Sequence, residues 1–328
     1  PAFTGTRGII AGMELIRGIH NILPQHQGCV LTIGNFDGVH LGHQAVLAKV
    51  QQLAQSLKLP SCVMVFEPQP LELFAGNAAP ARLSRFREKY QALAAVGIDR
   101  MLCVNFNRSF AAQDPQQFIK TLLLDKLGVR HLIVGDDFHF GKNRSGNYAL
   151  LAQAAAQYGF GLNSTSSLKL GEQRVSSTLI REALQQDQLD RAAAMLGRPF
   201  TLSGRVRHGR KLGRDLGFPT ANVWLYRRKL PVSGVYAITA HTCYGVFNGV
   251  ANIGNRPTVQ GSREQLEAHL FDFNQDLYGS QIRVALRHKL RAEQRFASLD
   301  ALQQQIAADV AAAQQYFSEA ASAQAPTT

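Results

Sequence analysis

The segment Gly34–His43, "GNFDGVHLGH", combines residue types that suit phosphate chemistry, and it follows the apolar run "CVLTI". Its glycines allow a tight turn and a close approach of the backbone to a ligand. The next residues have helical periodicity, and a helix N-terminus offers free N–H groups and a positive dipole end to an anion. His40 and His43 lie on one side of the first turn, where both can donate hydrogen bonds to phosphate oxygens. The residues expected to bind phosphate here are Gly34, Asn35, Phe36, Gly38 and Gly42.

Two familiar nucleotide sites do not fit this segment. No Gly-Lys-Ser/Thr follows it, so it is not a P-loop, and no G-x-G-x-x-G follows the strand, which disfavours a hydride-transfer site. Read without context, the same residues could form a glycine turn with an incidental histidine pair. Phosphoryl or nucleotidyl transfer is the chemistry that the residue types favour.

A second phosphate-binding segment is predicted at Val175–Arg181, "VSSTLIR". Ser177 and Thr178 would open a helix with hydroxyls and free N–H groups, and Arg181 would follow one turn later as a clamp on phosphate oxygens. The alternative is an ordinary N-cap followed by a solvated arginine.

A ligand ring could bind at "GDDFHFG", which follows the predicted strand at 131–135. Asp137 at the strand end can accept hydrogen bonds from such a ring, and Phe138 could pack against it. Aromatic residues at this point are otherwise part of the core.

The segment Gly213–Val223, "GRDLGFPTANV", predicts a metal-assisted phosphate site. Thr220 and Asn222 offer hard oxygen donors beside a proline kink, which suits Mg²⁺ held jointly with phosphates. The alternative is a turn that leads into a strand. The glycines expected to approach phosphate in this part of the chain are Gly204, Gly213 and Gly217.

The elements that must position these residues follow two patterns. Up to about Gly161, apolar β-rich runs alternate with amphipathic helical stretches, which predicts an α/β domain with a parallel sheet whose ligands bind at the carboxyl ends of its strands. After a helical stretch over 180–200, short strands with Gly, Pro and Asn turns predict an antiparallel barrel closed by a helix over 299–317.

The strands are expected at 29–33, 61–66, 101–106, 131–135, 234–241, 244–254, 266–273 and 281–290. The helices are expected at 43–57, 84–97, 115–128 and 148–159, and the predicted division is 13–187, a linker at 188–199, and 200–328.

Composition limits the function classes. A chain of 328 residues with 45% hydrophobic residues predicts two folded domains. Four singly placed cysteines favour buried thiols in a reducing compartment, so we expect a cytoplasmic protein. No apolar run approaches the roughly 20 residues of a membrane span, and no signal-peptide pattern is present. Residues 1–12 resemble a leader ahead of a start at Met13. The net charge of +12 is dispersed, so we do not expect a nucleic-acid partner, and we assign no oligomeric state.

Together the motifs resemble the bacterial bifunctional riboflavin kinase/FAD synthetase family. In the first half, "GNFDGVHLGH" is similar to the HxGH signature of nucleotidyltransferases, and "FEPQP", "VGDDFHFGKNRSG" and "VSSTLIR" follow in the family's order. In the second half the resemblance rests on "PTAN", "GVYA", "GVANIGNRPT" and "LEAHLFDFNQDLYG". The resemblance extends from Met13 to about Phe317. It implies a Rossmann-like FMN adenylyltransferase domain and a riboflavin kinase barrel.

The resemblance also implies roles for residues. His40 and His43 would act in adenylyl transfer, and Thr220 and Asn222 would serve Mg²⁺ and ATP. Glu267 would be the base for the ribityl hydroxyl of riboflavin, although strand alternation alone also allows it to face outward. The expected substrates and products are riboflavin, FMN, FAD and ATP, with flavin binding at Asp137 and Phe138.

Two departures and two alternatives accompany this interpretation. The family often has "FDPHP" and "DFRFG", so no histidine role carries over to Gln69, and His139 is not assigned a role. An adenylyltransferase for a nicotinate or pantetheine phosphate would explain HxGH but would leave "PTAN" without a purpose. A basic nucleic-acid-binding module would explain only the charge.

Overall fold

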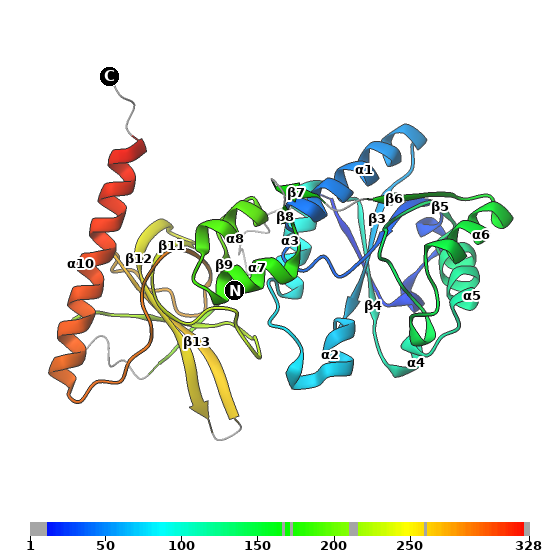
Figure 1. Ribbon diagram of the computed structural model, residues 1–328. Helices are drawn as coiled ribbons and strands as arrows, with labels where there is room; N and C mark the ends of the chain where they lie inside the picture. Colours follow the sequence, from blue (N-terminus) through cyan, green and yellow to red (C-terminus); the bar gives the residue numbers. More distant parts are fainter. Residues whose placement is uncertain (1–11, 166–167, 171–172, 210–215, 259–260, 325–328) are drawn as a thin grey trace, which may run out of the picture. The chain divides into compact units, whose positions relative to one another are not determined.

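The computed structural model describes residues 12–165, 168–170, 173–209, 216–258 and 261–324. The chain forms two compact units (Figure 1). The first comprises the described residues up to Pro80 together with Ser84–Ser177. The second comprises Ala81–Leu83 and the described residues from Thr178 onward.

A six-stranded parallel sheet forms the centre of the first unit, in the order β1-β4-β3-β2-β5-β6. Its strands are β1 (Glu14–Arg17), β2 (Cys29–Ile33), β3 (Ser61–Glu67), β4 (Arg100–Asn105), β5 (Val129–Gly135) and β6 (Gly161–Thr165). After β2 the chain builds one side of the sheet with β3 and β4 and then returns to the other side with β5. This reversal lies between β2 and β5, and ligands of open α/β sheets bind at such switch points.

Helices cover both faces of this sheet, which explains why its central strands β2 and β3 are mostly apolar and buried. On one face, Leu31 and Met64 pack with Leu122 and Leu151 from two helices, η4 and α6. On the other face, α1 and α3 cover strand residues such as Val63 (Figure 1). The helices are α1 (Leu41–Leu57), α2 (Pro70–Ala75), α3 (Phe86–Val96), α4 (Arg108–Ala111), α5 (Pro115–Gln117), the π-helix η4 (Phe118–Lys126) and α6 (Tyr148–Tyr158).

Shorter elements complete the first unit. They are the 3-10 turns η1 (Ile19–Asn21), η2 (Pro24–His26), η3 (Gly76–Ala78) and η5 (Lys142–Arg144), and the two-stranded pair β7 (Lys169–Leu170) and β8 (Gln173–Arg174).

The second unit is a closed barrel of six antiparallel strands, in the order β10-β13-β12-β11-β14-β9. The strands are β9 (Thr201–Arg207), β10 (Ala221–Trp224), β11 (Gly234–Thr242), β12 (Gly245–Thr258), β13 (Gly261–Leu270) and β14 (Gln281–Arg291). Helix α10 (Leu299–Gln324) lies against the barrel (Figure 1), where Ala313 is buried beside Val235 and Ala237. The predicted fold class is therefore confirmed for both units.

The helical stretch predicted at 180–200 is two helices, α7 (Ser177–Gln185) and α8 (Leu189–Leu196). Asp187 has a φ of 59°, in the left-handed region that ends a helix. The segment predicted as a linker thus contains α8, in which Leu189, Met195 and Leu196 are buried. The predicted domain bounds stay a prediction.

The cysteines are free, and Cys29 and Cys62 are buried as expected. Cys243, however, is exposed in the turn between β11 and β12, so the expectation of buried thiols is wrong for this residue. Within the described ranges, no helix has the length and apolar character needed to cross a membrane.

Candidate active sites

The first candidate site lies at the carboxyl ends of β2, β5 and β6, where the sheet order reverses. A cavity of about 270 Å³ opens there. Its walls include Gly34 and Phe36 after β2, Asp137 after β5 and Ser177 at the start of α7. Residues predicted from three separate motifs therefore meet at one cavity.

The two histidines form a stacked pair at the N-terminus of α1. His40 is the N-cap residue, and its Nδ1 accepts a hydrogen bond of 3.2 Å from the backbone N–H of His43. The two rings stack with centroids 3.6 Å apart, and Phe36 packs against His43 at 5.0 Å. Because Nδ1 of His40 is an acceptor, the neutral ring carries its proton on Nε2, which is then a donor.

The surroundings of His43 keep its imidazole neutral. Burial is the largest cause that lowers its pKa well below the ordinary value of 6.5, followed by the charges of His40 and of Lys89 on α3. Lys89 is completely buried. Nδ1 of His43 is also buried and has no hydrogen-bond partner among the described residues. At neutral pH, His43 can therefore act as a hydrogen-bond donor but not as a cation.

A buried polar network fixes the turn that carries these histidines. The Ser84 hydroxyl accepts a hydrogen bond of 2.9 Å from the backbone N–H of Gly38 and donates to Oδ1 of Asp37 at 3.2 Å. The backbone N–H of Ser84 donates to the same carboxylate oxygen at 2.9 Å. The network holds a turn in which Phe36 and Val39 have φ values of 46° and 43°, which non-glycine residues adopt only at a cost.

Gly42 is needed for close packing at the start of α1. A Cβ there would lie 3.1 Å from the His40 ring and 3.3 Å from the carbonyl oxygen of Val175. A side chain at this position would push the HxGH turn away from the segment that leads into α7.

The rest of the cavity wall contains both predicted and unpredicted residues. The Ser177 hydroxyl donates to the carbonyl of Asp37 at 2.9 Å. Asp137 is exposed and pairs with Arg174 at 3.1 Å, and Arg174 also lines the cavity. Phe138 is not among the lining residues, because it packs partly into the core beside Phe140.

Other predicted residues lie elsewhere. Asn35 is exposed and Gly38 is buried, and neither lines the cavity. Thr178 and Arg181 belong to the second unit, where Nε of Arg181 donates to the carbonyl of Ala81 at 2.6 Å. Their role in phosphate binding stays a prediction.

Gln69 and His139 are the two positions at which this sequence departs from the family's usual motifs. Gln69 is buried and is the N-cap residue of α2. His139 is exposed, and its Nδ1 lies 2.9 Å from the carbonyl oxygen of Asp137.

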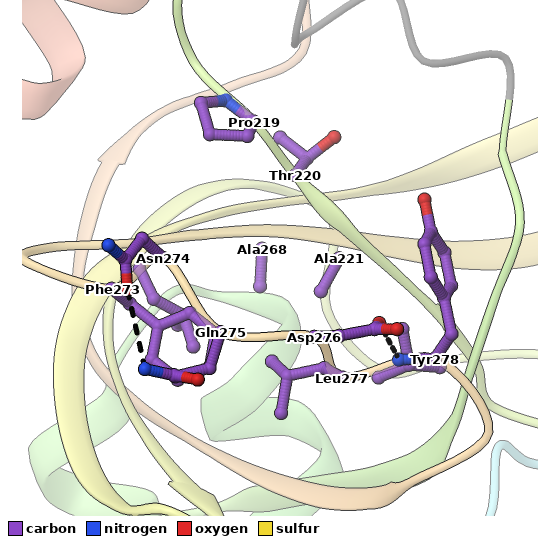
Figure 2. Close-up of a pocket in the computed structure, with 12 residues that line it drawn as sticks. Pro219, Thr220, Ala221, Ala268, Phe273, Asn274, Gln275, Asp276, Leu277 and Tyr278 are labelled. Carbon is purple, nitrogen blue, oxygen red and sulfur yellow. Dashed lines mark hydrogen bonds between the residues drawn. The ribbon is translucent and has the colours of Figure 1, made fainter.

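The second candidate site lies in the barrel, where a cavity of about 500 Å³ opens beside the "PTAN" segment. Figure 2 shows Pro219 and Thr220 across this cavity from the loop 273–278. In that loop the backbone N–H of Tyr278 donates to Asp276 at 2.8 Å, which fixes the turn (Figure 2). The loop contributes uncharged side chains and one carboxylate to the wall.

Thr220 also lines a neighbouring cavity of about 250 Å³ between the barrel and α10. Glu267 lies in this second cavity, and so do apolar residues of α10, among them Leu302 and Ile306. The predicted metal ligand Thr220 is therefore shared by both cavities, while the predicted base lines only the one beside α10.

Asn222 and Glu267 are neighbours across paired strands. Asn222 on β10 is in register with Glu267 on β13. The side-chain amide of Gln265 links them, because its Nε2 donates to Asn222 Oδ1 at 2.5 Å and to Glu267 Oε1 at 2.9 Å. Gln265 is a residue of this site that the sequence did not reveal.

The predicted glycines of the barrel differ in their surroundings. Gly204 lies in β9 directly against Val223 and Trp224, so its small size serves strand packing. Gly217 has a φ of 86° and open space around it. Gly213 lies outside the described residues.

Comparison with known proteins identifies a separate family match for each half of the chain. The family described as FAD synthetase matches residues 22–179, and the family described as riboflavin kinase matches residues 196–317. A protein of Escherichia coli K12, "Bifunctional riboflavin kinase/FMN adenylyltransferase", is 55% identical over 311 residues, which cover 93% of this chain and 98% of that protein. The chain belongs to this family. The counterpart in Pseudomonas fluorescens is 51% identical and covers 92% of this chain and 97% of its own.

A solved structure has a similar fold. It is described as a macrolide-efflux protein from Streptococcus pneumoniae and is 27% identical, with a TM-score of 0.77. The match covers 91% of this chain and 97% of that one. The combination of sheet unit and barrel is therefore also present in a solved structure.

Proposed function

We propose that this chain converts riboflavin to FMN with ATP in the barrel, and FMN to FAD with a second ATP in the sheet unit, releasing pyrophosphate. The observation that carries the proposal is that each unit has its own cavity, lined by the family's motif residues. An adenylyltransferase for another phosphate would leave the barrel cavities without a substrate.

In the kinase reaction, Glu267 accepts the proton of the riboflavin 5′-hydroxyl as that oxygen attacks the γ-phosphorus of ATP. The cavity between the barrel and α10 suits the flavin, because Leu302 and Ile306 offer apolar surface to its ring while charged side chains such as Arg291 line the rest. The larger cavity beside the "PTAN" segment suits ATP. Thr220 lines both cavities and thus lies where the two substrates would meet.

The residues of the barrel fit Mg²⁺. Thr220 and Asn222 supply a hydroxyl and an amide oxygen, and Mg²⁺ commonly takes few protein ligands together with substrate phosphates and water. No group of three or more His, Cys, Asp or Glu side chains gathers as a metal centre in the part of the chain that the structure describes. When bound, Mg²⁺ would offset charge on the transferred phosphoryl group.

In the adenylyl transfer, a phosphate oxygen of FMN attacks the α-phosphorus of ATP and pyrophosphate leaves. His40 and the neutral His43 donate N–H groups to the charge that develops, and the free N–H groups of α1 add to this field. The Ser177 hydroxyl lies on the same cavity, while the contributions of Thr178 and Arg181 stay predictions. Asp137 and Phe138 are the candidates for contact with the flavin ring.

The free cysteines agree with a cytoplasmic location of the protein.

A time course tests this proposal. The purified protein is incubated with riboflavin, ATP and Mg²⁺, and the flavins are separated by chromatography. We expect FMN to rise first and then to give way to FAD, and we expect a chelator to stop the first step. Riboflavin that stays unchanged would contradict the proposal, and FMN without FAD would contradict its second half.

A further inference from the structure

The amide of Gln265 lies between the two predicted functional side chains of the barrel. One nitrogen, Nε2, donates to Asn222 Oδ1 at 2.5 Å and to Glu267 Oε1 at 2.9 Å. Strand pairing creates this arrangement, because Trp224 is in register with Gln265 and Asn222 with Glu267. Residues two apart on a strand share a face, so all three polar side chains lie on one side of the β10–β13 pair.

The chemistry of these groups fixes the direction of each hydrogen bond. An ionised Glu267 can only accept, so Gln265 must present its NH₂ end to it. The second hydrogen of that NH₂ group can then be accepted only by the oxygen end of the Asn222 amide. Glu267 therefore determines how Gln265 is oriented, and Gln265 determines which end of Asn222 is the oxygen.

The orientation matters because the two ends of an asparagine amide have nearly the same shape but opposite chemistry. Mg²⁺ binds the oxygen and rejects the NH₂ group. An amide oxygen has two lone pairs, so Asn222 can accept from Gln265 with one and keep the other for a metal.

Close packing against Gly209 restricts where the Asn222 amide can go. A Cβ at Gly209 would lie closest to Nδ2 of Asn222, and also 2.5 Å from its Cγ and 2.6 Å from its Oδ1. Asn222 is only 7% exposed. The amide is thus confined in position, and the choice that is left to it is a flip of its two ends.

We propose that Gln265 is a positioning residue that holds the oxygen of Asn222 in the orientation Mg²⁺ requires and couples this orientation to the position of the Glu267 side chain. The inference rests on the proposed kinase function of the barrel. It predicts that loss of the Gln265 donor weakens Mg²⁺ binding, although Gln265 itself does not touch the metal.

The sequence provides a local reporter for the test. Trp224 is the single tryptophan of the chain, and it lies on β10 two residues from Asn222. Mg²⁺ is titrated at saturating ADP while Trp224 fluorescence is recorded. Gln265→Met keeps the length of the side chain and removes the donor. We expect it to raise the Mg²⁺ midpoint roughly 10-fold, as loss of an outer-shell partner commonly does.

Two further variants separate positioning from general damage. Gln281→Met alters an exposed glutamine at the start of β14 and should leave the midpoint unchanged. Asn222→Asp offers oxygen at both ends, so the orientation of the group no longer matters. In the N222D background, Q265M should therefore shift the midpoint by less than about 2-fold, a clear departure from additivity.

The outcomes are distinct. A Q265M midpoint equal to that of the unmodified protein overturns the inference, and so does an equal shift in the N222D background. A Trp224 signal that does not respond to Mg²⁺ and ADP in the unmodified protein also overturns it. Suppose that Mg²⁺ and ADP change Trp224 fluorescence in the unmodified protein, but that this protein does not phosphorylate riboflavin. This result contradicts the proposed function, while the Q265M titration still tests the inference.

Discussion

His43 shows how the surroundings of one residue decide its chemistry. Its ring stacks on His40 at 3.6 Å, and burial, His40 and the buried Lys89 all lower its pKa. A histidine pair beside phosphate suggests two cations when the sequence alone is considered. The structure favours a neutral donor at His43, so in the proposed adenylyl transfer the anion would be held by N–H groups and dipoles at the start of α1.

The lowered pKa of His43 predicts a pH dependence of stability. Below the ordinary pKa of 6.5, His43 is protonated in the unfolded chain but stays neutral in the folded protein. The free energy of unfolding should therefore fall as pH decreases below 6.5, by about 1.4 kcal/mol per pH unit for this one group, until the lower folded pKa is reached. His43→Asn should remove this part of the slope in urea unfolding curves. His20→Asn, at an exposed histidine, should keep it. Equal slopes in the unmodified protein and H43N would contradict the prediction.

Ser84 should matter for the first site although it lies 44 residues after His40 in the sequence. Ser84→Ala removes the hydroxyl that binds Gly38 and Asp37, and we expect a loss of about 1–2 kcal/mol in the free energy of unfolding. FAD formation from FMN should fall roughly 10-fold as the HxGH turn loosens, while FMN formation from riboflavin should not change. Ser56→Ala on the exposed side of α1 is the matched control. Equal loss in S84A and S56A would show that the network does not position the turn.

Among the elements, α10 forms one wall of the cavity that contains Glu267, and an ion pair anchors this helix to the barrel. Arg291 on β14 binds Asp309 on α10 through contacts of 2.8–3.1 Å, and the Asp309 side chain is only 6% exposed. Gln305 also donates to Asp309 at 3.0 Å. The helix thus has a polar anchor next to its apolar contacts with Val235 and Ala237.

Breaking this anchor should cost more than removing it. Asp309→Ala leaves Arg291 partly buried without its carboxylate, and we expect a loss of about 2–3 kcal/mol in the free energy of unfolding and a higher KM for riboflavin. The double variant R291M/D309A removes both charges and should recover part of the stability. Denaturant unfolding and riboflavin kinetics of both variants test this. A double variant that is no more stable than D309A would contradict the expectation.

Much of the element plan could be predicted from the sequence because apolar runs and Gly/Pro turns mark it. The strand predicted at 29–33 matches β2 (Cys29–Ile33), and both fold classes are confirmed. Errors arose where a break has no obvious signal. The 180–200 stretch breaks at Asp187, and the strand predicted to reach 273 ends at Leu270 because Asp272 turns with a φ of 53°.

The candidate sites could be predicted only in part. Motif residues such as His40 and Glu267 stand out by type and spacing. Ser84 and Gln265 do not, because their roles come from contacts between segments far apart in the chain or on adjacent strands. Single-sequence patterns indicate which face a strand residue occupies but not which residue of another strand it meets.

For the whole molecule, the central claim is that one chain carries two separate sites. The sheet unit and the barrel each have an independent core and cavities lined by their own residues. The claim therefore predicts that each activity can be removed without the other.

The most direct test uses two variants, His43→Ala and Glu267→Ala, each assayed with riboflavin and with supplied FMN in the presence of ATP and Mg²⁺. H43A should form FMN normally and lose FAD formation about 10²–10³-fold, as loss of a transition-state donor does. E267A should lose FMN formation about 10²–10⁴-fold, as loss of a general base does, and still convert supplied FMN to FAD. A mixture of the two variants should restore FAD synthesis from riboflavin. If either variant lost both activities to the same extent while remaining folded, the two-site account would be contradicted.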